Sequence, residues 1–225
     1  MPTPQSALDR AYSTILDGIL NGKFPPGTML AEAPLAAEIG VSRTPVRTAL
    51  ARLQDDGWIT VYPKRGALVK GLSERAVADL ADARLILEST SVQRADAASR
   101  EALTSRLDES IEVQRNTLSR GDLRAFIESA IAFHRSFVEA GQNMVLLELN
   151  DRLADRQRFL LFSYGDALLG RCADIINEHV VLVQELRDGD ATAFAETLRR
   201  HLGETYGTDL RMLCPDPSFS MQPTK

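Results

Sequence analysis

Residues 40–57 read Gly-Val-Ser-Arg-Thr-Pro-Val-Arg-Thr-Ala-Leu-Ala-Arg-Leu-Gln-Asp-Asp-Gly, and the rest of the chain can be understood from this stretch. Its apolar residues fall at the i, i+3, i+4 and i+7 spacing of one helix face, which predicts an amphipathic helix with this buried stripe: Val46, Ala49, Leu50 and Leu53. Thr44 can cap the helix with Pro45 in its first position, or Ser42 can cap it one turn earlier. Gly57 is expected to end the helix.

The face opposite this stripe carries two arginines and two hydroxyl side chains near the predicted N-terminus: Arg43, Thr44, Arg47 and Thr48. A helix N-terminus favours anions through its free N–H groups and its dipole. Arginine reads guanine edges in a DNA major groove, and hydroxyl and N–H groups bind phosphate. The pattern is therefore that of a DNA recognition helix, although taken alone it also suits a surface helix with a basic, solvated face.

The flanking segments favour DNA. Residues 8–20 have helical apolar spacing, and residues 34–39 form a second, short helical segment. Residues 58–62 and 67–70 are β-type runs, joined by a basic turn, Pro63-Lys64-Arg65-Gly66. Helix, helix, tight turn, recognition helix and β-hairpin in this order predict a winged helix-turn-helix domain.

The first 70 or so residues resemble the winged helix-turn-helix domain of the GntR transcription regulators. The matching residues are Ile15, Gly18-Ile-Leu, Gly22, Pro26-Gly27, Leu30, Glu32, Leu35-Ala36, Gly40 to Arg47, Ala49-Leu50, Leu53, Gly57 and Gly66. The resemblance implies that Arg43 and Arg47 contact DNA from the recognition helix. It also implies that Gly66 lies at the tip of the wing, close to the minor groove.

Two departures from the family pattern bear on the operator that the chain would read. The family usually carries polar or charged residues at the positions of Ala33 and Pro34, and one of these often contacts DNA. Thr48 stands where the family usually has Glu. We therefore expect the preferred DNA sequence to differ from the family norm.

Charge and composition limit the class of protein. The 225 residues carry a net charge of -5, divided into +2 over residues 1–72 and -7 over residues 73–225. An acidic second half would weaken non-specific attraction to DNA.

No run approaches the ~20 apolar residues of a membrane span, and the N-terminus lacks a secretory signal. Cys172 and Cys214 have no metal-type spacing, so we expect free thiols in a cytoplasmic protein, with one disulfide as the alternative.

We place a domain boundary at Gly71-Leu-Ser-Glu74, which separates a DNA-binding domain, residues 1–72, from a second domain, residues 73–225. Glycine stops and Asp, Ser or Asn caps predict six helices and no strand in the second domain. We expect helices over about 76–98, 100–118, 123–140 and 144–164, a loose segment at 165–170, and helices ending at 186 and about 213. The residues from 217 onward are expected to fray. The fold class is thus mainly α, a winged helix-turn-helix followed by an all-α six-helix bundle.

The second domain resembles the all-helical FCD type of ligand-binding domain of the FadR branch, over about residues 73–213. The matching positions are Arg84 to Glu88, Phe133-His134, Gly141 to Asn143, Glu178-His179, Gly189-Asp190 and His201-Leu202. The resemblance implies that the bundle binds an effector and dimerises.

The chain has three histidines, each on a different predicted helix of the bundle: His134, His179 and His201. The resemblance implies that they are ligands of a divalent metal ion, and imidazole suits zinc or nickel. The fourth ligand of the family, an Asp one turn before the first histidine, is Ala130 here. Three histidines can still hold a metal, with a position open to an anionic effector. Alternatively, each histidine is a hydrogen-bonded core residue.

Arg84 is the second candidate for the effector site. It lies in the middle of a mostly apolar helix, where a buried cation needs a partner. Glu88, four residues later, could be that partner, or Arg84 could hold the carboxylate of a small organic acid. The second alternative makes Arg84, His134, His179 and His201 the predicted effector-binding set.

The sequence thus predicts a transcription regulator, not an enzyme. Two subunits of a homodimer would present their recognition helices to a pseudo-palindromic operator, and a small carboxylate effector, with or without metal, would control the affinity. Repression is favoured over activation.

One alternative function is an α-helical metal hydrolase with the three histidines as metal ligands and Glu128 or Glu178 as general base. The chain lacks the HExxH, nucleophile-elbow and phosphate-loop motifs that would support it. A second rival is a bundle that only binds another protein.

Overall fold

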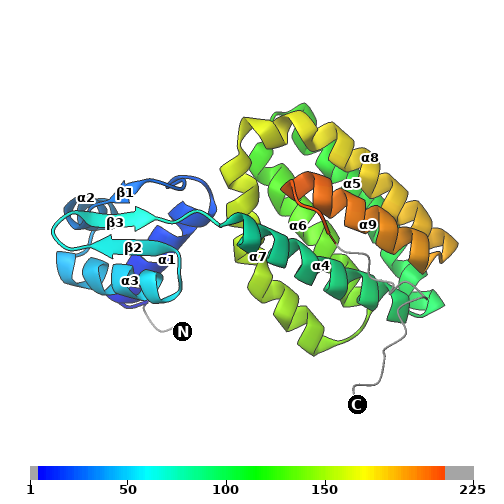
Figure 1. The fold of residues 1–225 in the computed structure, drawn as a ribbon, viewed down its shortest axis with the longest axis horizontal. Coiled ribbons are helices and arrows are strands. Elements are labelled where there is room, and N and C mark those ends of the chain that lie inside the picture. The colour runs from blue at the N-terminus through cyan, green and yellow to red at the C-terminus, as the bar shows by residue number, and fades with distance from the viewer. Residues whose placement is uncertain (1–4, 211–225) are drawn as a thin grey trace, which may run out of the picture. The chain divides into compact units, whose positions relative to one another are not determined.

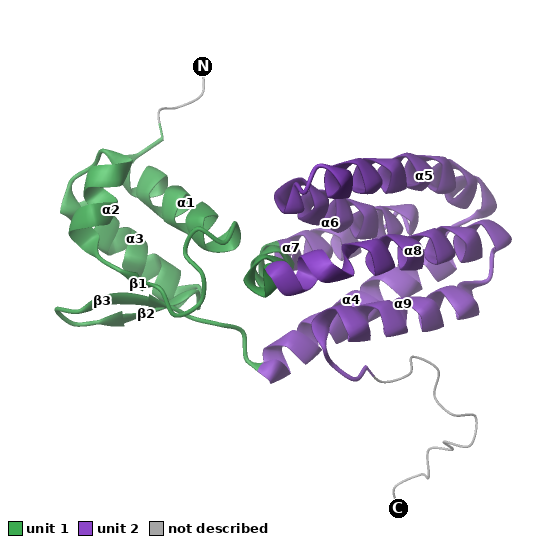
Figure 2. Cartoon of the chain, turned by 90° about the horizontal axis from the view of Figure 1, so that it is seen from above, with its two compact units in different colours: residues 1–73, 155–165 green, residues 74–154, 166–225 purple. Residues whose placement is uncertain are grey.

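The computed structural model describes residues 5–210, which are mainly helical with one small antiparallel sheet, as predicted (Figure 1). These residues form two compact units (Figure 2). The first consists of residues 5–73 together with the segment Asp155–Gly165. The second consists of Glu74–Ala154 and residues 166–210.

The first unit contains the predicted winged helix-turn-helix. Its helices and strands are α1 (Ala7–Leu20), β1 (Met29–Leu30), α2 (Glu32–Ile39), α3 (Arg43–Asp55), β2 (Ile59–Tyr62) and β3 (Gly66–Val69). Ser42 is the N-cap residue of α3, the earlier of the two predicted starts, and Asp56 is its C-cap. Gly40 ends α2 in the left-handed conformation, with φ 72°, and this allows the tight turn into α3.

The three strands pair antiparallel in the order β1-β3-β2. In the register of β2 and β3, Tyr62 faces Gly66, and the turn between them is the predicted wing. The sequence does not predict β1, a strand of two residues in which Leu30 faces Ala67. So short a strand has no alternation of its own to detect, and it exists because β3 provides its hydrogen-bond partners.

The predicted stripe of α3 is buried in the core of the first unit, where it packs with apolar residues of α1, α2 and the sheet. The members of this stripe are at most 3% exposed: Val46, Ala49, Leu50 and Leu53. Phe159 belongs to the same core, and its ring meets that of Trp58 edge to face at 5.6 Å between centroids. Burial of this face fixes which side of α3 remains in solvent.

The remaining helices form the predicted all-helical part of the chain. They are α4 (Glu74–Arg94), α5 (Ala97–Ser119), α6 (Leu123–Ala140), α7 (Met144–Tyr164), α8 (Asp166–Asp188) and α9 (Ala191–Tyr206). In the second unit, α5 packs against α6 and α8, α4 packs against α6 and α9, and α8 packs against α9. None of the helices in residues 5–210 has the length and apolar character needed to cross a membrane.

Three predicted boundaries in this part are wrong. The helix expected over 76–98 ends at Arg94, because Asp96 caps a new helix by accepting a hydrogen bond from the Ser99 amide at 2.7 Å. The loose segment expected over 165–170 is already helical from Asp166, and only Gly165 interrupts the helix. The helix expected to about 213 ends at Tyr206, because Gly207 caps it with φ 64°. Residues 207–210 are not helical, and residues 211–213 lie outside the described residues.

Among the described residues Cys172 forms no disulfide, and its side chain is buried in α8. Its Sγ donates a hydrogen bond to the Leu168 carbonyl at 3.3 Å. Cys214 and the tail from Pro217 lie outside the described residues.

Candidate nucleic-acid interface and metal centre

The exposed face of α3 carries the predicted DNA-contacting residues. Burial of the apolar stripe leaves all four on the opposite side in solvent: Arg43, Thr44, Arg47 and Thr48. The Thr48 hydroxyl donates to the Thr44 carbonyl at 3.2 Å, so its oxygen can accept a further hydrogen bond. The side chains of Arg43 and Arg47 are 64% and 68% exposed.

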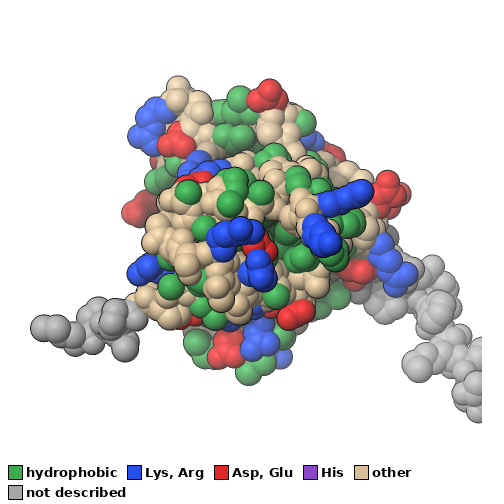
Figure 3. Space-filling model, turned by 90° about the vertical axis from the view of Figure 1, so that its left-hand side faces the viewer, with side chains coloured by type: hydrophobic (Ala, Val, Ile, Leu, Met, Phe, Trp, Pro, Cys, Tyr) green, Lys and Arg blue, Asp and Glu red, His purple; other side chains and the backbone are tan. Residues whose placement is uncertain are grey.

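The wing borders the same face. A groove of about 610 Å³ runs between the start of α2, the exposed face of α3 and the wing turn, and the four basic side chains that line it are Arg43, Arg47, Lys64 and Arg65. Lys and Arg side chains are visible on the face of the molecule drawn in Figure 3. The turn is tight, since Lys64 adopts φ 63° and Gly66 adopts φ 114°. The structure thus brings five of the seven predicted DNA-binding residues to one groove, and the other two, Thr44 and Thr48, are exposed on α3 outside its lining.

One acidic residue of this groove has a contact that the sequence analysis did not anticipate. Glu32, in the first turn of α2, accepts hydrogen bonds from Arg47 Nε at 2.8 Å and Arg47 Nη2 at 2.9 Å. It also accepts one from Arg43 Nη2 at 3.2 Å. The hydrogen bond from Arg47, with the charges of both arginines, lowers the pKa of Glu32 to about 2. The carboxylate is therefore ionised at neutral pH.

The three histidines come together in the core of the second unit, from α6, α8 and α9. His134 Nε2 lies 3.1 Å from His201 Nε2 and 3.2 Å from His179 Nε2. All three side chains are buried. The Phe133 ring stacks on His179 at 4.1 Å between centroids and closes one side of the cluster.

Each imidazole is oriented by a side chain that faces its other nitrogen. Nδ1 of His134 lies 2.7 Å from Glu88 Oε2, Nδ1 of His179 lies 2.7 Å from Gln114 Oε1, and Nδ1 of His201 lies 2.6 Å from Glu178 Oε2. Each of these oxygens accepts a hydrogen bond from the protonated Nδ1, so each Nε2 carries a lone pair, and the three lone pairs are directed at one another. Burial, with the positive charge of Arg84 and the other histidines, lowers the pKa of His134 and His179 well below the usual value, so both are neutral at pH 7.

This arrangement fits a divalent metal. Three lone pairs without a proton between them repel, and a cation at their meeting point removes the repulsion. Tetrahedral zinc at about 2.0–2.1 Å from each nitrogen would separate the nitrogens by ~3.3 Å, close to the 3.1 and 3.2 Å found here. Ala130, one turn before His134, is buried and offers no ligand atom. The described residues therefore supply three nitrogen donors from the imidazoles and leave coordination open to a small molecule.

Arg84 lies in the same core and pairs with Glu88, as the i+4 spacing predicts. Arg84 Nε donates to Glu88 Oε1 at 2.9 Å, and Nη1 donates to the Tyr206 hydroxyl. Nη2 lies 2.8 Å from Glu88 Oε1, yet the angle gives it no hydrogen bond, and no acceptor for it is present among the described residues. Burial raises the pKa of Glu88 to about 7, while the Arg84 charge opposes this shift. Arg84 therefore keeps an N–H donor for an anion beside the histidines.

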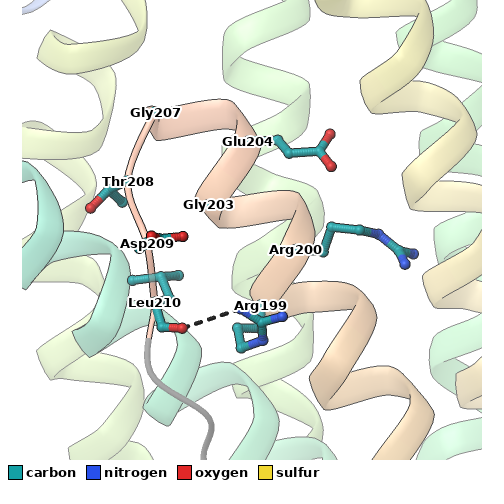
Figure 4. Close-up of a pocket in the computed structure, with 8 residues that line it drawn as sticks. All are labelled: Arg199, Arg200, Gly203, Glu204, Gly207, Thr208, Asp209 and Leu210. Carbon is teal, nitrogen blue, oxygen red and sulfur yellow. Dashed lines mark hydrogen bonds between the residues drawn. The ribbon is translucent and has the colours of Figure 1, made fainter.

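A separate surface hollow at the end of α9 contains none of the predicted effector residues. Figure 4 shows its lining, in which Arg199 Nη1 donates to the Leu210 carbonyl at 3.2 Å: Arg199, Arg200, Gly203, Glu204, Gly207, Thr208, Asp209 and Leu210. The general-base role that the hydrolase alternative gives Glu178 has no support in its contacts. Glu178 also pairs with Arg171 at 2.9 Å, so both of its oxygens are already engaged.

Comparison with known proteins gives two family matches. Residues 8–69 match the family described as bacterial regulatory proteins, gntR family, and residues 79–204 match the FCD domain. A helix-turn-helix transcriptional regulator of Agrobacterium vitis is 33% identical over 57% of this chain and 77% of its own length. The gluconate operon transcriptional repressor of Bacillus licheniformis is 26% identical over 84% of this chain and 79% of its own.

Solved structures agree on the fold. A GntR transcriptional regulator from Rhodococcus sp. RHA1 superposes with a TM-score of 0.74 at 22% identity, over 89% of this chain and 95% of that one. The McbR/YncC protein of E. coli gives a TM-score of 0.69 at 20% identity, over 90% and 96%. At such low identity these likenesses establish the architecture alone.

Proposed function

The chain belongs to the gntR family of bacterial regulatory proteins and carries an FCD domain, and from this premise we propose that it is a repressor that binds its operator as a homodimer. It is a DNA-binding transcription regulator, and the relatives with named functions are transcriptional repressors, such as those of the gluconate operon. The observation that carries the proposal is the single groove on which the exposed face of α3 and the basic wing turn meet.

On DNA, the residues of the groove take different roles. Arg47 and Arg43 lie at the N-terminal half of α3, where their guanidinium groups would hydrogen-bond guanine O6 and N7 in the major groove. Thr44 and Thr48 would bind phosphate or a base edge beside them. The wing would reach the neighbouring phosphates or minor groove with Lys64, Arg65 and Gly66. We therefore propose that residues 1–72 form the DNA-binding domain.

Residues 73–225 would then sense a small molecule. His134, His179 and His201 would hold a divalent metal, zinc or nickel, which supplies a Lewis-acidic positive charge when it is bound. Arg84 would bind the carboxylate of an organic acid through Nη2, which is ion-paired with Glu88 but makes no hydrogen bond among the described residues. Because Ala130 supplies no carboxylate, the effector acid would complete the site in its place. An effector that binds the DNA-competent dimer less well than the free dimer releases the operator.

Selection of duplexes from a random pool by the purified protein tests the DNA half. We expect enrichment of a pseudo-palindromic sequence, and Arg47→Ala should reduce the preference for that sequence over random duplex by about 5- to 150-fold per half-site. Unchanged discrimination by this variant would refute the assignment of α3, and failure of the wild-type protein to prefer any duplex would refute the proposed function.

Thermal melting tests the sensor half. Zinc or nickel should raise the melting temperature, and replacement of His179 by Phe should abolish the increase without loss of DNA binding. A screen of small carboxylic acids should then find further stabilisation that requires Arg84. If neither metal nor acid changes the melting temperature of the purified protein, the sensor assignment is wrong while the DNA-binding assignment stands.

A further inference from the structure

Glu32 joins the two arginines of the recognition helix through one carboxylate. Both of its oxygens accept from Arg47, at 2.8 Å to Nε and 2.9 Å to Nη2, so the pair is bidentate. The same Oε2 accepts from Arg43 Nη2 at 3.2 Å. The Glu32 side chain is 24% exposed and belongs to the first residue of α2, whereas the side chains of Arg43 and Arg47 are 64% and 68% exposed. The rigid partner in this contact is therefore the acidic one.

A bidentate contact fixes the orientation of the guanidinium as well as its distance from the carboxylate. An exposed arginine samples many rotamers, and two parallel N–H···O bonds hold its guanidinium in one plane and one direction. Direct readout of guanine requires the guanidinium to lie near the plane of the base, with two N–H groups directed at O6 and N7. In this geometry Arg47 Nη1 makes no hydrogen bond to Glu32. Glu32 thus holds one edge of the guanidinium and leaves N–H groups for a base.

Glu32 also alters the charge of the groove. Among the residues that line it, Glu32 is the one carboxylate, and four cationic side chains line the same groove: Arg43, Arg47, Lys64 and Arg65. Its ionised form therefore removes one unit of the positive charge that would otherwise attract any phosphate backbone. Non-specific attraction grows with the number of phosphates neutralised and falls with salt accordingly.

We infer that Glu32 is a positioning residue that sets the sequence discrimination of this protein, by orienting Arg47 for base readout and by weakening attraction to DNA of any sequence. The inference rests on the proposed DNA-binding role of α3. Glu32 then has two separable effects. Its orientation of Arg47 depends on the length of the side chain, and its weakening of non-specific attraction to DNA depends on its negative charge.

Two variants separate these effects. Glu32→Gln keeps the side-chain length and removes the charge, so affinity for random duplex should rise several-fold and the slope of log affinity against log salt should steepen by about 0.9. Glu32→Asp keeps the charge and withdraws the carboxylate by one methylene group, so the salt slope should stay unchanged. Both variants should lower the ratio of operator to random-duplex affinity by at least about 5-fold, since Arg47 loses its bidentate partner.

The matched control is Glu38→Gln. Glu38 lies on the same helix, pairs with Lys23, and is not part of the groove. This variant should leave both the operator-to-random ratio and the salt slope as in the wild type. Equal melting temperatures of the full-length Glu32 and Glu38 variants, measured alongside, would show that the change in DNA binding does not come from unfolding of α2.

The outcomes are distinguishable. A reduced ratio for both Glu32 variants, with a steeper slope for Glu32→Gln alone, supports the inference. An unchanged ratio in Glu32→Gln and Glu32→Asp overturns it, even where Arg47→Ala still abolishes discrimination. Loss of discrimination is meaningful only where the wild-type protein has it, so a wild-type protein with no preferred duplex would defeat the proposed function first.

Discussion

At the scale of single residues, the three imidazoles in the core show how one ring can perform two tasks. In His201, Nδ1 faces Glu178 at 2.6 Å while Nε2 faces His134 at 3.1 Å. The first contact fixes the tautomer and the ring orientation, and the second leaves a lone pair for a ligand. Loss of a supporting oxygen should therefore weaken metal binding by about 10- to 100-fold.

Gly66 provides a residue-scale prediction in the first unit. Its φ of 114° is reserved for glycine, and a Cβ there would lie 2.5 Å from the Leu30 carbonyl oxygen in the paired strand β1. Gly66→Ala should therefore destabilise this unit by roughly 1–3 kcal/mol and weaken operator binding through the wing. Trp58, the single tryptophan of the chain, lies in this unit, so urea unfolding followed by its fluorescence provides the measurement.

Gly57→Ala is the matched control for this substitution. Gly57 has φ 87°, but a Cβ added there would meet nothing within 4 Å. We expect it to cost only the backbone strain, about 1 kcal/mol, and to leave DNA binding intact. Equal loss of stability in the two variants would contradict the clash between Gly66 and Leu30.

At the scale of helices and strands, local signals predicted what local contacts determine. The boundaries of α6, Leu123–Ala140, agree with the prediction because Asp122 caps the helix by accepting from the Ala125 amide at 3.0 Å. The break after Arg94 escaped prediction because no glycine or proline marks it. An Asp inside an otherwise continuous helical pattern gives no sign of whether it caps a helix or faces solvent.

Contacts between distant segments could not be predicted. The family resemblance predicts that the three histidines lie together, but nothing in the sequence pairs Gln114 with His179, 65 positions apart. Glu32 was noted only as a family match, and its hydrogen bonds with Arg47 depend on how α2 packs against α3. Phe159, on α7, lies in the core of the first unit, and no local pattern in the sequence predicts this contact.

The turn of α6 before His134 gives an element-scale prediction. Ala130→Asp would place a carboxylate one helical turn from His134, on the same face of the helix. Without metal the buried charge should lower stability by roughly 1–3 kcal/mol. With zinc, the added ligand should tighten metal binding by at least the ~10-fold that a supporting residue contributes, and it should weaken the binding of an effector acid that uses the same position. Zinc titration with a competing chelator, together with melting with and without zinc, measures both effects.

Ala132→Asp adds the same charge to the exposed face of α6. It should change neither the stability nor the zinc affinity beyond the small effect of a surface substitution. If Ala130→Asp and Ala132→Asp bind zinc with equal affinity, the position before His134 does not face the metal, and the argument that the effector completes the site is wrong.

At the scale of the whole molecule, charge is divided between the two parts of the chain. Residues 1–72 carry a net charge of +2, and residues 73–225 carry -7. Attraction to DNA of any sequence should therefore be weak, and we expect a shallow salt dependence on random duplex compared with proteins that make many phosphate contacts. In the proposed homodimer, affinity would therefore come mainly from sequence readout by two recognition helices, which would make it sensitive to any ligand that changes the population of the DNA-competent dimer.

The last prediction concerns the coupling of the two parts. If zinc changes operator affinity by a given factor, operator must change zinc affinity by the same factor, because the two bindings share one thermodynamic cycle. We expect a factor of about 5 to 150, the usual range for coupled sites. Operator affinity measured by anisotropy with and without saturating zinc gives one side of the cycle. Zinc affinity measured by a competing indicator, in the presence of operator or of random duplex, gives the other.

The Arg47→Ala variant should bind zinc with unchanged affinity in the absence of DNA, and operator should no longer change its zinc affinity. A factor of one on both sides, with zinc bound, would mean that metal stabilises the bundle without regulating the DNA-binding part.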